Sequence, residues 1–279
     1  MGDGGTHSLR AWLVLAAGAA AVVVAAVAIL GGFSSGSAAP STSTVSKVGV
    51  RSHPASASGR SPTTASDPAV STALSNEQAT ALASVQKVSA TALLADGKPE
   101  VFFMSALYCP FCAAERWALV RATARFGRWT GLTPLHSHVG VDGFGSVPTY
   151  DLLHATFTSR YITVDHKDVA DENGNALQSL TTSEQALVNA YDGGGSIPFM
   201  VAGGTSVRYQ VGLAYSPGLL VGRSFAVVRA AVYSNSRTPG ARAINAEADA
   251  LTAVICRLTA HRPSSVCRTR LIERMDHEL

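Results

Sequence analysis

The chain has 279 residues, of which 47% are hydrophobic and only 15% are charged, against about 25% charged residues in an average globular protein. The formal net charge is +3, and no cluster of arginine and lysine is present, which excludes a nucleic-acid-binding protein that depends on a basic surface. Four cysteines are too few for a disulfide scaffold, and the mean hydropathy of +0.19 is high for a soluble protein.

Residues 11–33 form the first distinctive segment, because they include no charged residue. As a helix, these 23 residues would extend about 35 Å and cross a hydrocarbon core of about 30 Å. We therefore predict a transmembrane helix at residues 11–33, after a short N-terminal segment at residues 1–10. The alternative is a cleaved signal peptide, since Ser37-Ala38-Ala39 resembles a cleavage site.

Residues 34–75 are rich in serine, threonine, proline and alanine and have few large apolar residues. Such a composition cannot bury enough surface to offset its ordering entropy, so we predict a disordered linker. A linker that follows an N-terminal anchor suits a domain held outside the membrane. The expected protein is a single-pass protein of the cell membrane whose C-terminal domain, residues 76–279, is extracytoplasmic.

A Cys-x-x-Cys motif lies where a predicted strand meets a predicted helix. The strand is the apolar run at residues 100–107, and the helix follows the motif and ends near Gly127. Cys109 would start this helix, where free backbone N–H groups and the helix dipole favour a thiolate. Cys112, about one turn later, could attack a mixed disulfide formed at Cys109. The motif therefore predicts a redox-active Cys109–Cys112 disulfide with Cys109 as the catalytic nucleophile and Cys112 as the resolving thiol.

Two alternative interpretations of the motif involve metal ions. A zinc site needs two more ligands at a similar spacing, and the other two cysteines lie far along the chain. His136 and His138 would project from one face of a strand and could join the two cysteines in a copper site. No further ligand follows from the spacing, so we expect no metal site.

A second feature is a loop of three glycines, residues 193–195, that leads through Ile197-Pro198 into an apolar segment. The Gly203-Gly204 turn follows this segment and precedes another strand-like run. The pattern predicts a β-hairpin directly after the proline.

Cys256 and Cys267 lie in a predicted helical region near the C-terminus. Four cysteines allow three pairings, and local pairing within each half is the simplest, which predicts a Cys256–Cys267 disulfide. Such a bond would stabilise the fold by about 2–4 kcal/mol in an oxidising compartment. It could be a structural disulfide, or a second redox pair that passes electrons to the first.

Long segments of the chain resemble a thioredoxin-like family that is catalogued as a domain of unknown function. The resemblance extends over residues 76–267 and rests on the segments SALYCPFCAAERWALV, GGGSIPFMVAGG and AVICRLTAHRPSSVC. It implies an α/β fold of thioredoxin type, with three α/β/α layers around a mixed central sheet, often behind an N-terminal membrane anchor. It does not supply a substrate.

The resemblance also implies roles for residues near the motif. In thioredoxin-like folds the proline of Ile197-Pro198 would be cis and would lie opposite the reactive cysteine, and the residue before it would offer backbone groups to an extended substrate. Tyr108, Pro110 and Phe111 are the other candidate substrate contacts. Thioredoxin itself has a tryptophan before the first cysteine and Gly-Pro between the cysteines. This chain has neither, which leaves open whether it reduces or oxidises its substrates.

The separation between Cys109 and Pro198 is longer than a minimal thioredoxin core requires. We therefore expect a helical insertion at about residues 146–191, with a helix from Ser183, which could be a lid, a partner surface or a structural elaboration.

Together these features predict a membrane-tethered thiol-disulfide oxidoreductase that acts on protein thiols or disulfides. A membrane redox partner would be consistent with this function. No dissociable cofactor is expected, and no nucleic acid. The alternatives are a non-catalytic binding domain of the same fold, whose disulfides are both structural, and a copper-handling protein.

Overall fold

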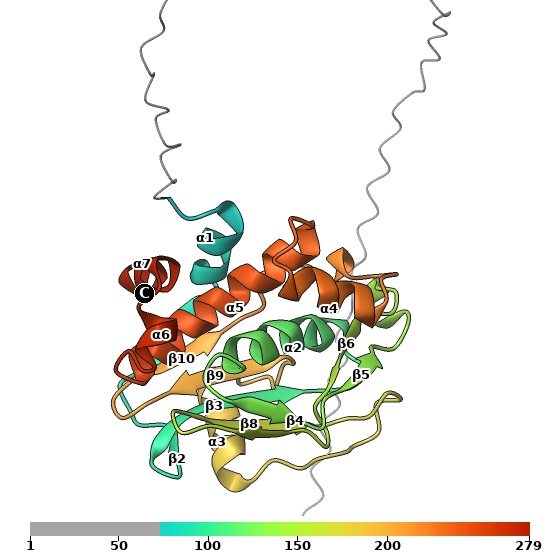
Figure 1. Ribbon diagram of the computed structural model, residues 1–279. Helices are drawn as coiled ribbons and strands as arrows, with labels where there is room; N and C mark the ends of the chain where they lie inside the picture. Colours follow the sequence, from blue (N-terminus) through green and yellow to red (C-terminus); the bar gives the residue numbers. More distant parts are fainter. Residues whose placement is uncertain (1–72) are drawn as a thin grey trace, which may run out of the picture. The chain divides into compact units, whose positions relative to one another are not determined.

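The computed structural model describes residues 73–279, and all statements about structure refer to this range (Figure 1). The predicted transmembrane helix at residues 11–33, and residues 34–72 of the predicted linker, lie outside it. No helix within the described range is both long and apolar enough to cross a bilayer. The first helix, α1 (Asn76–Ala83), begins with a capping box in which the Ser75 hydroxyl accepts a hydrogen bond from the backbone of Gln78.

The centre of the fold is a mixed sheet with strand order β1-β10-β9-β3-β8, and the short β2 pairs with the start of β3. Strand β3 runs parallel to β8 and antiparallel to β9, and the remaining pairs are antiparallel. The strands are β1 (Val85–Ser89), β2 (Leu94–Ala95), β3 (Lys98–Ser105), β8 (Thr163–Asp168), β9 (Phe199–Gly203) and β10 (Arg208–Val211).

Strand β3 lies between β9 and β8, and its second half is buried on both faces. Val101 and Phe103 belong to the core on one face, and Phe102 and Met104 belong to a smaller core on the other. A strand that is covered on both faces needs apolar residues at successive positions, which explains why residues 101–104 of β3 are an uninterrupted apolar run rather than an alternating one.

Helices cover both faces of the sheet, with most of them on one side (Figure 1). Helices α2 (Pro110–Thr123) and α5 (Pro239–Leu258) contribute to the larger core, and α3 (Thr182–Tyr191) contributes to the smaller one. Helix α5 is also the support on which the peripheral helices pack. These are α1, α4 (Phe225–Tyr233), α6 (Ser264–Cys267) and α7 (Arg270–Glu278).

The segment between α2 and β8 differs from the predicted helical insertion. It forms two small antiparallel sheets, β4 with β7 and β5 with β6, and one 3-10 turn, η1. Their bounds are β4 (Arg128–Thr130), β5 (Thr133–His136), η1 (Val141–Gly143), β6 (Pro148–Asp151) and β7 (Thr156–Thr158).

The helix expected from Ser183 is confirmed as α3. The prediction that residues 146–191 are an insertion was wrong, because the range includes β8, which belongs to the central sheet, and because α3 covers that sheet. Strand β8 has the sequence TVDHKD and lies at the sheet edge with most positions half-buried. An edge strand of this composition lacks the apolar pattern by which buried strands are recognised.

Two buried carboxyl groups lie where α2 packs on α5. Glu115 of α2 and Glu247 of α5 are each 1% exposed, and the Glu247 carboxylate accepts a hydrogen bond from the backbone of Ala214 at 2.7 Å. Burial raises the pKa of Glu247 to about 8. Burial, together with the nearby Glu247 charge, raises the pKa of Glu115 well above its usual range. The pair therefore retains at least one proton at neutral pH.

This pair predicts a pH dependence of stability. The pKa of Glu247 rises on folding from 4.5 to about 8, so the folded protein binds more protons than the unfolded chain between these values. The free energy of unfolding should therefore fall as the pH rises through this window, by up to about 1.4 kcal/mol per pH unit for this group. Glu247→Gln should reduce the slope. Urea unfolding across this pH range measures it.

The exposed Glu172 offers a control, since Glu172→Gln should leave the slope unchanged. An equal slope in wild type and Glu247→Gln would contradict the assignment of the pH dependence to this pair.

Candidate functional site

The Cys-x-x-Cys motif lies at the junction of β3 and α2, as its sequence context predicts. Cys109 is the N-cap of α2, Pro110 occupies the first turn, and the Cys109 sulfur accepts a hydrogen bond from the backbone N–H of Cys112 at 3.2 Å. Proline suits this position because no N–H is needed there. Both cysteines are buried and are drawn as free thiols in this structure, so the redox-active Cys109–Cys112 disulfide stays a prediction.

The two thiols have opposite electrostatic environments. The pKa of Cys109 is lowered by the neighbouring Cys112 thiol, by the backbone N–H groups of Cys112 and Phe111 and by the charge of Arg116, which together outweigh burial. The pKa of Cys112 is raised well above its usual range by burial and by the adjacent Cys109. Cys109 is therefore the sulfur that ionises first, and Cys112 keeps its proton.

A buried ion pair lies behind the cysteines and was missed by the sequence reasoning. Arg116 of α2 donates to the carboxylate of Asp168 at 2.5 Å, to the Ser105 hydroxyl at 3.1 Å and to the Ala106 carbonyl at 3.1 Å. The side chains of the ion pair are 0% and 1% exposed. The group ties the ends of β3 and β8 to the helix that carries the cysteines.

One sequence signal could have identified this ion pair. Glu115 and Arg116 are the only charged residues between the motif and Arg121, in a helix that is otherwise apolar on all sides. Charged residues in such a helix are buried with it and need partners. The sequence does not show that Asp168, from the polar strand β8, is the partner.

The loop before β9 brings Ile197 to the cysteines. The Ile197-Pro198 bond is cis, and the Ile197 carbonyl oxygen lies 4.0 Å from the Cys109 sulfur. This position follows from the pairing of β9 with β3, which places the start of one strand beside the end of the other. The structure thus brings together the two cysteines and Ile197, with Tyr108 and Phe111 packed against the same small apolar cluster.

The segments between α2 and β8 border this cluster. The Phe111 ring packs edge-to-face on Phe144, with centroids 5.4 Å apart, and the backbone of His138 donates to the Tyr108 carbonyl at 3.0 Å. His136 is the last residue of β5. Within residues 73–279, no three His, Cys, Asp or Glu side chains are grouped closely enough to hold a metal ion.

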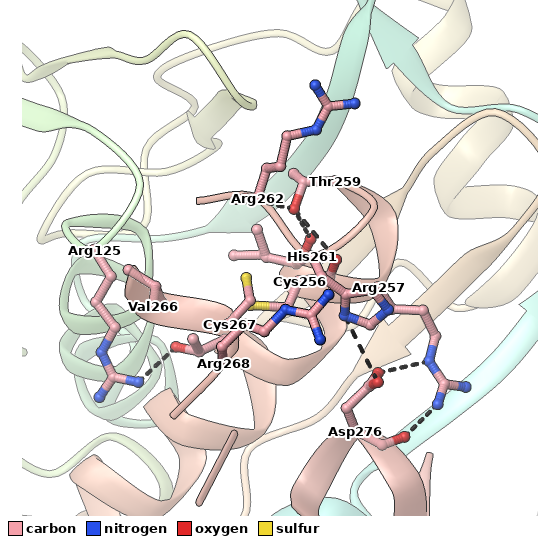
Figure 2. The surroundings of a disulfide bond; sticks show 12 residues. Arg125, Cys256, Arg257, Thr259, His261, Arg262, Val266, Cys267, Arg268 and Asp276 are labelled. Carbon is pink, nitrogen blue, oxygen red and sulfur yellow. Dashed lines mark hydrogen bonds and ion pairs between the residues drawn. A yellow bond between two sulfur atoms is a disulfide. The ribbon is translucent and has the colours of Figure 1, made fainter. Parts of the chain in front are cut away.

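The second cysteine pair forms a disulfide between the end of α5 and α6, as Figure 2 shows. Cys256 is 0% and Cys267 is 2% exposed. Arg125, which follows α2, donates to Thr252 of α5 and lines a pocket together with Val266 of α6. The disulfide therefore lies near the C-terminal end of α2. Cys109 caps the opposite end of this 14-residue helix, about 20 Å away at 1.5 Å per residue.

Comparison with known proteins gives one match. A protein-family model described as "Domain of unknown function (DUF929)" matches residues 84–257. This range includes the Cys-x-x-Cys motif, the Ile197-Pro198 loop and all strands of the central sheet. No curated protein and no solved structure matches the chain.

The ion pair predicts opposite effects of its two partners on Cys109. Arg116→Met removes a positive charge that lowers the pKa of Cys109, so this pKa should rise. Asp168→Asn leaves the arginine without its counter-charge, so the pKa should fall, in each case by up to about 1 unit. The pH dependence of the alkylation rate of Cys109 measures both.

Arg121→Met is the matched control, because Arg121 lies on the same helix but donates to Asn245 of α5. Shifts of the same sign in Arg116→Met and Asp168→Asn would contradict the prediction.

Proposed function

The chain belongs to this family of unknown function, and we propose that it is a thiol-disulfide oxidoreductase of thioredoxin-like fold that acts on proteins. One observation carries the proposal. The Cys109 sulfur, with a lowered pKa, lies at a helix N-terminus beside the backbone of Ile197, and a protonated Cys112 lies behind it. A permanently structural pair would need no such difference between its two thiols, so this asymmetry favours redox exchange.

The topology supports a thioredoxin-like fold. The reactive pair lies at a strand-to-helix junction, the Ile197-Pro198 loop lies beside it, and the β9–β10 hairpin follows the proline. Helices cover both faces of a mixed sheet. These are the features that the family resemblance implies.

The proposed reaction begins when the Cys109 thiolate attacks one sulfur of a substrate disulfide. The substrate S–S bond breaks, the second substrate sulfur leaves as a thiolate that takes up a proton, and a Cys109–substrate disulfide forms. Cys112 then loses its proton and attacks the Cys109 sulfur, which releases the first substrate sulfur as a thiolate. The substrate gains two electrons and the cysteine pair loses them. The same steps in reverse oxidise a substrate dithiol.

The Ile197 backbone supports a role in holding the substrate. Its carbonyl lies beside the Cys109 sulfur, in a loop before β9 begins. An extended substrate chain could pair with this backbone as an added strand while its own sulfur meets Cys109. Tyr108, Pro110 and Phe111 would form the surrounding contact surface.

We also propose that residues 11–33 anchor the protein in the cell membrane with the domain outside the cytoplasm. The Cys256–Cys267 disulfide suits an oxidising compartment. Protein thiols or disulfides would be the substrates, and a membrane redox partner would return the Cys109–Cys112 pair to its starting state. The chemistry needs no dissociable cofactor.

Trapping tests the reaction. In Cys112→Ser the second step is blocked, so mixed disulfides between Cys109 and substrate proteins should accumulate and should disappear when a reductant is added. In Cys109→Ser no such adducts should form. Non-reducing gels and mass spectrometry of the adducts provide the measurement.

An absence of adducts in Cys112→Ser, together with an ordinary Cys109 pKa near 8.5, would refute the oxidoreductase.

A further inference from the structure

A long stretch of the sequence has no acidic residue. Residues 193–246 contain no aspartate, glutamate or lysine but five arginines. Two of these arginines have structural partners, since Arg208 donates to the Ala92 carbonyl and Arg242 pairs with Glu77. The others are exposed and form no ion pair with any residue in the described range. They are Arg223, Arg229 and Arg237.

The same stretch exposes apolar side chains. Of the seven large hydrophobic residues that are exposed in residues 73–279, four lie between positions 219 and 233. Val227 is 54% and Tyr233 is 41% exposed on α4, and Leu219 and Val221 precede this helix. Arg229 also stacks on the Tyr233 ring at 5.4 Å. We call these four apolar residues and the three arginines without an ion pair the α4 surface.

An apolar pocket opens beside this surface. It has a volume of about 230 Å³ and lies between the 3-10 turn η2 (Pro217–Leu219), α4 and the start of α5. Leu219, Val227 and Val228 line it together with Arg223. An apolar hollow with a guanidinium on its lining suits a ligand that joins hydrocarbon to a negative charge.

We propose that the α4 surface docks on an anionic lipid bilayer. The arginines would bind lipid phosphates, and Leu219, Val221 and Val227 would enter the boundary between headgroups and acyl chains. Exposed apolar residues beside basic residues are the pattern by which helices lie in a membrane interface, where electrostatic attraction to anionic lipids adds to the burial of apolar surface. An acidic protein partner would match the charges but would not account for the exposed apolar side chains.

The position of the proposed anchor favours a bilayer as the partner. This inference rests on the membrane anchoring proposed above, although not on the redox chemistry. Only 42 residues, 34–75, separate the anchor from α1. The linker predicted from the sequence would have a root-mean-square span of about 35 Å, which would keep the domain near the bilayer.

Docking would also bring the redox site close to the membrane. Phe111 of the Cys-x-x-Cys motif packs on Phe144. Gly218 lies next to the Phe144 ring, since a Cβ built on Gly218 would be 3.5 Å from it. Gly145 lies next to Val221, since a Cβ built on Gly145 would be 2.8 Å from the Val221 side chain. The α4 surface is thus continuous with the surroundings of Cys109, and substrates at the bilayer surface would be favoured.

Hydrogen exchange of the full chain tests the docking. The protein is reconstituted in nanodiscs of phosphatidylcholine alone or with phosphatidylglycerol, and exchange is followed by mass spectrometry. Amides of residues 217–237 should exchange several-fold more slowly in the anionic discs. High salt should remove the difference, because it screens exposed charges. Both discs hold the same anchor, so the difference reports on the α4 surface.

Matched variants assign the effect. The triple variant Arg223→Glu, Arg229→Glu and Arg237→Glu should lose the protection, and so should Val227→Asp. Leu94→Asp and Arg160→Glu should keep it, because both residues are exposed on other elements. Leu94, on β2, is 39% exposed.

Several results would overturn the docking: no difference between the discs, equal slowing in neutral discs, or slowing without lipid that grows with protein concentration, which would indicate a second copy of the chain. Protection by a soluble acidic polypeptide but not by anionic discs would also overturn it. Trapping by Cys112→Ser separates the two proposals, since the docking variants should still form adducts with soluble substrates.

Discussion

The buried ion pair between Arg116 and Asp168 is the interaction on which the site depends. It joins three elements, because Arg116 belongs to α2 and Asp168 is the last residue of β8. Arg116 also donates to the Ser105 hydroxyl at the end of β3 and to the carbonyl of the next residue, Ala106. Two charges without water are costly to bury, and removal of one partner from such a pair costs about 3–5 kcal/mol. The pair therefore fixes how α2 meets the sheet. It also fixes the position of Cys109, which is held both at the end of β3 and at the start of α2.

Two adjacent charged residues of α2, Glu115 and Arg116, lie on different sides of the helix and have different partners. Arg116 extends to the ends of the strands, and its charge helps to lower the pKa of Cys109. Its neighbour Glu115 lies beside Glu247 of α5, and this acidic pair retains at least one proton at neutral pH. Because the acidic pair is at least partly neutral, it adds little field at the sulfurs. The Asp168 carboxylate, paired with Arg116, is then the acidic group that offsets the positive charge of Arg116 and the helix N-terminus near Cys109.

The sequence predicts those parts of the site that depend on neighbours along the chain. The strand before the motif, the helix after it and the hairpin after Pro198 all follow local patterns, and the structure contains them as β3, α2 and β9–β10. The parts that it does not predict depend on distant partners. Strand β8 is polar and is recognisable only by its pairing with β3. Arg116 can form its buried ion pair only because the pairing of β8 with β3 places Asp168 at the end of the sheet.

The two cysteine pairs lie at opposite kinds of helix end, and this difference changes the reactivity expected of a cysteine. Cys109 is the N-cap of α2, where free N–H groups favour a thiolate, whereas Cys256 lies in the last turn of α5, where the negative end of the helix dipole disfavours one. A thiolate that is disfavoured is also a poor leaving group, so the Cys256–Cys267 bond resists thiol attack. Both sulfurs are buried, and the length of α2 separates this disulfide from Cys109, which adds to this resistance. Thiol-disulfide exchange between this bond and the Cys109–Cys112 pair is therefore disfavoured, which is consistent with Cys256–Cys267 as a structural bond.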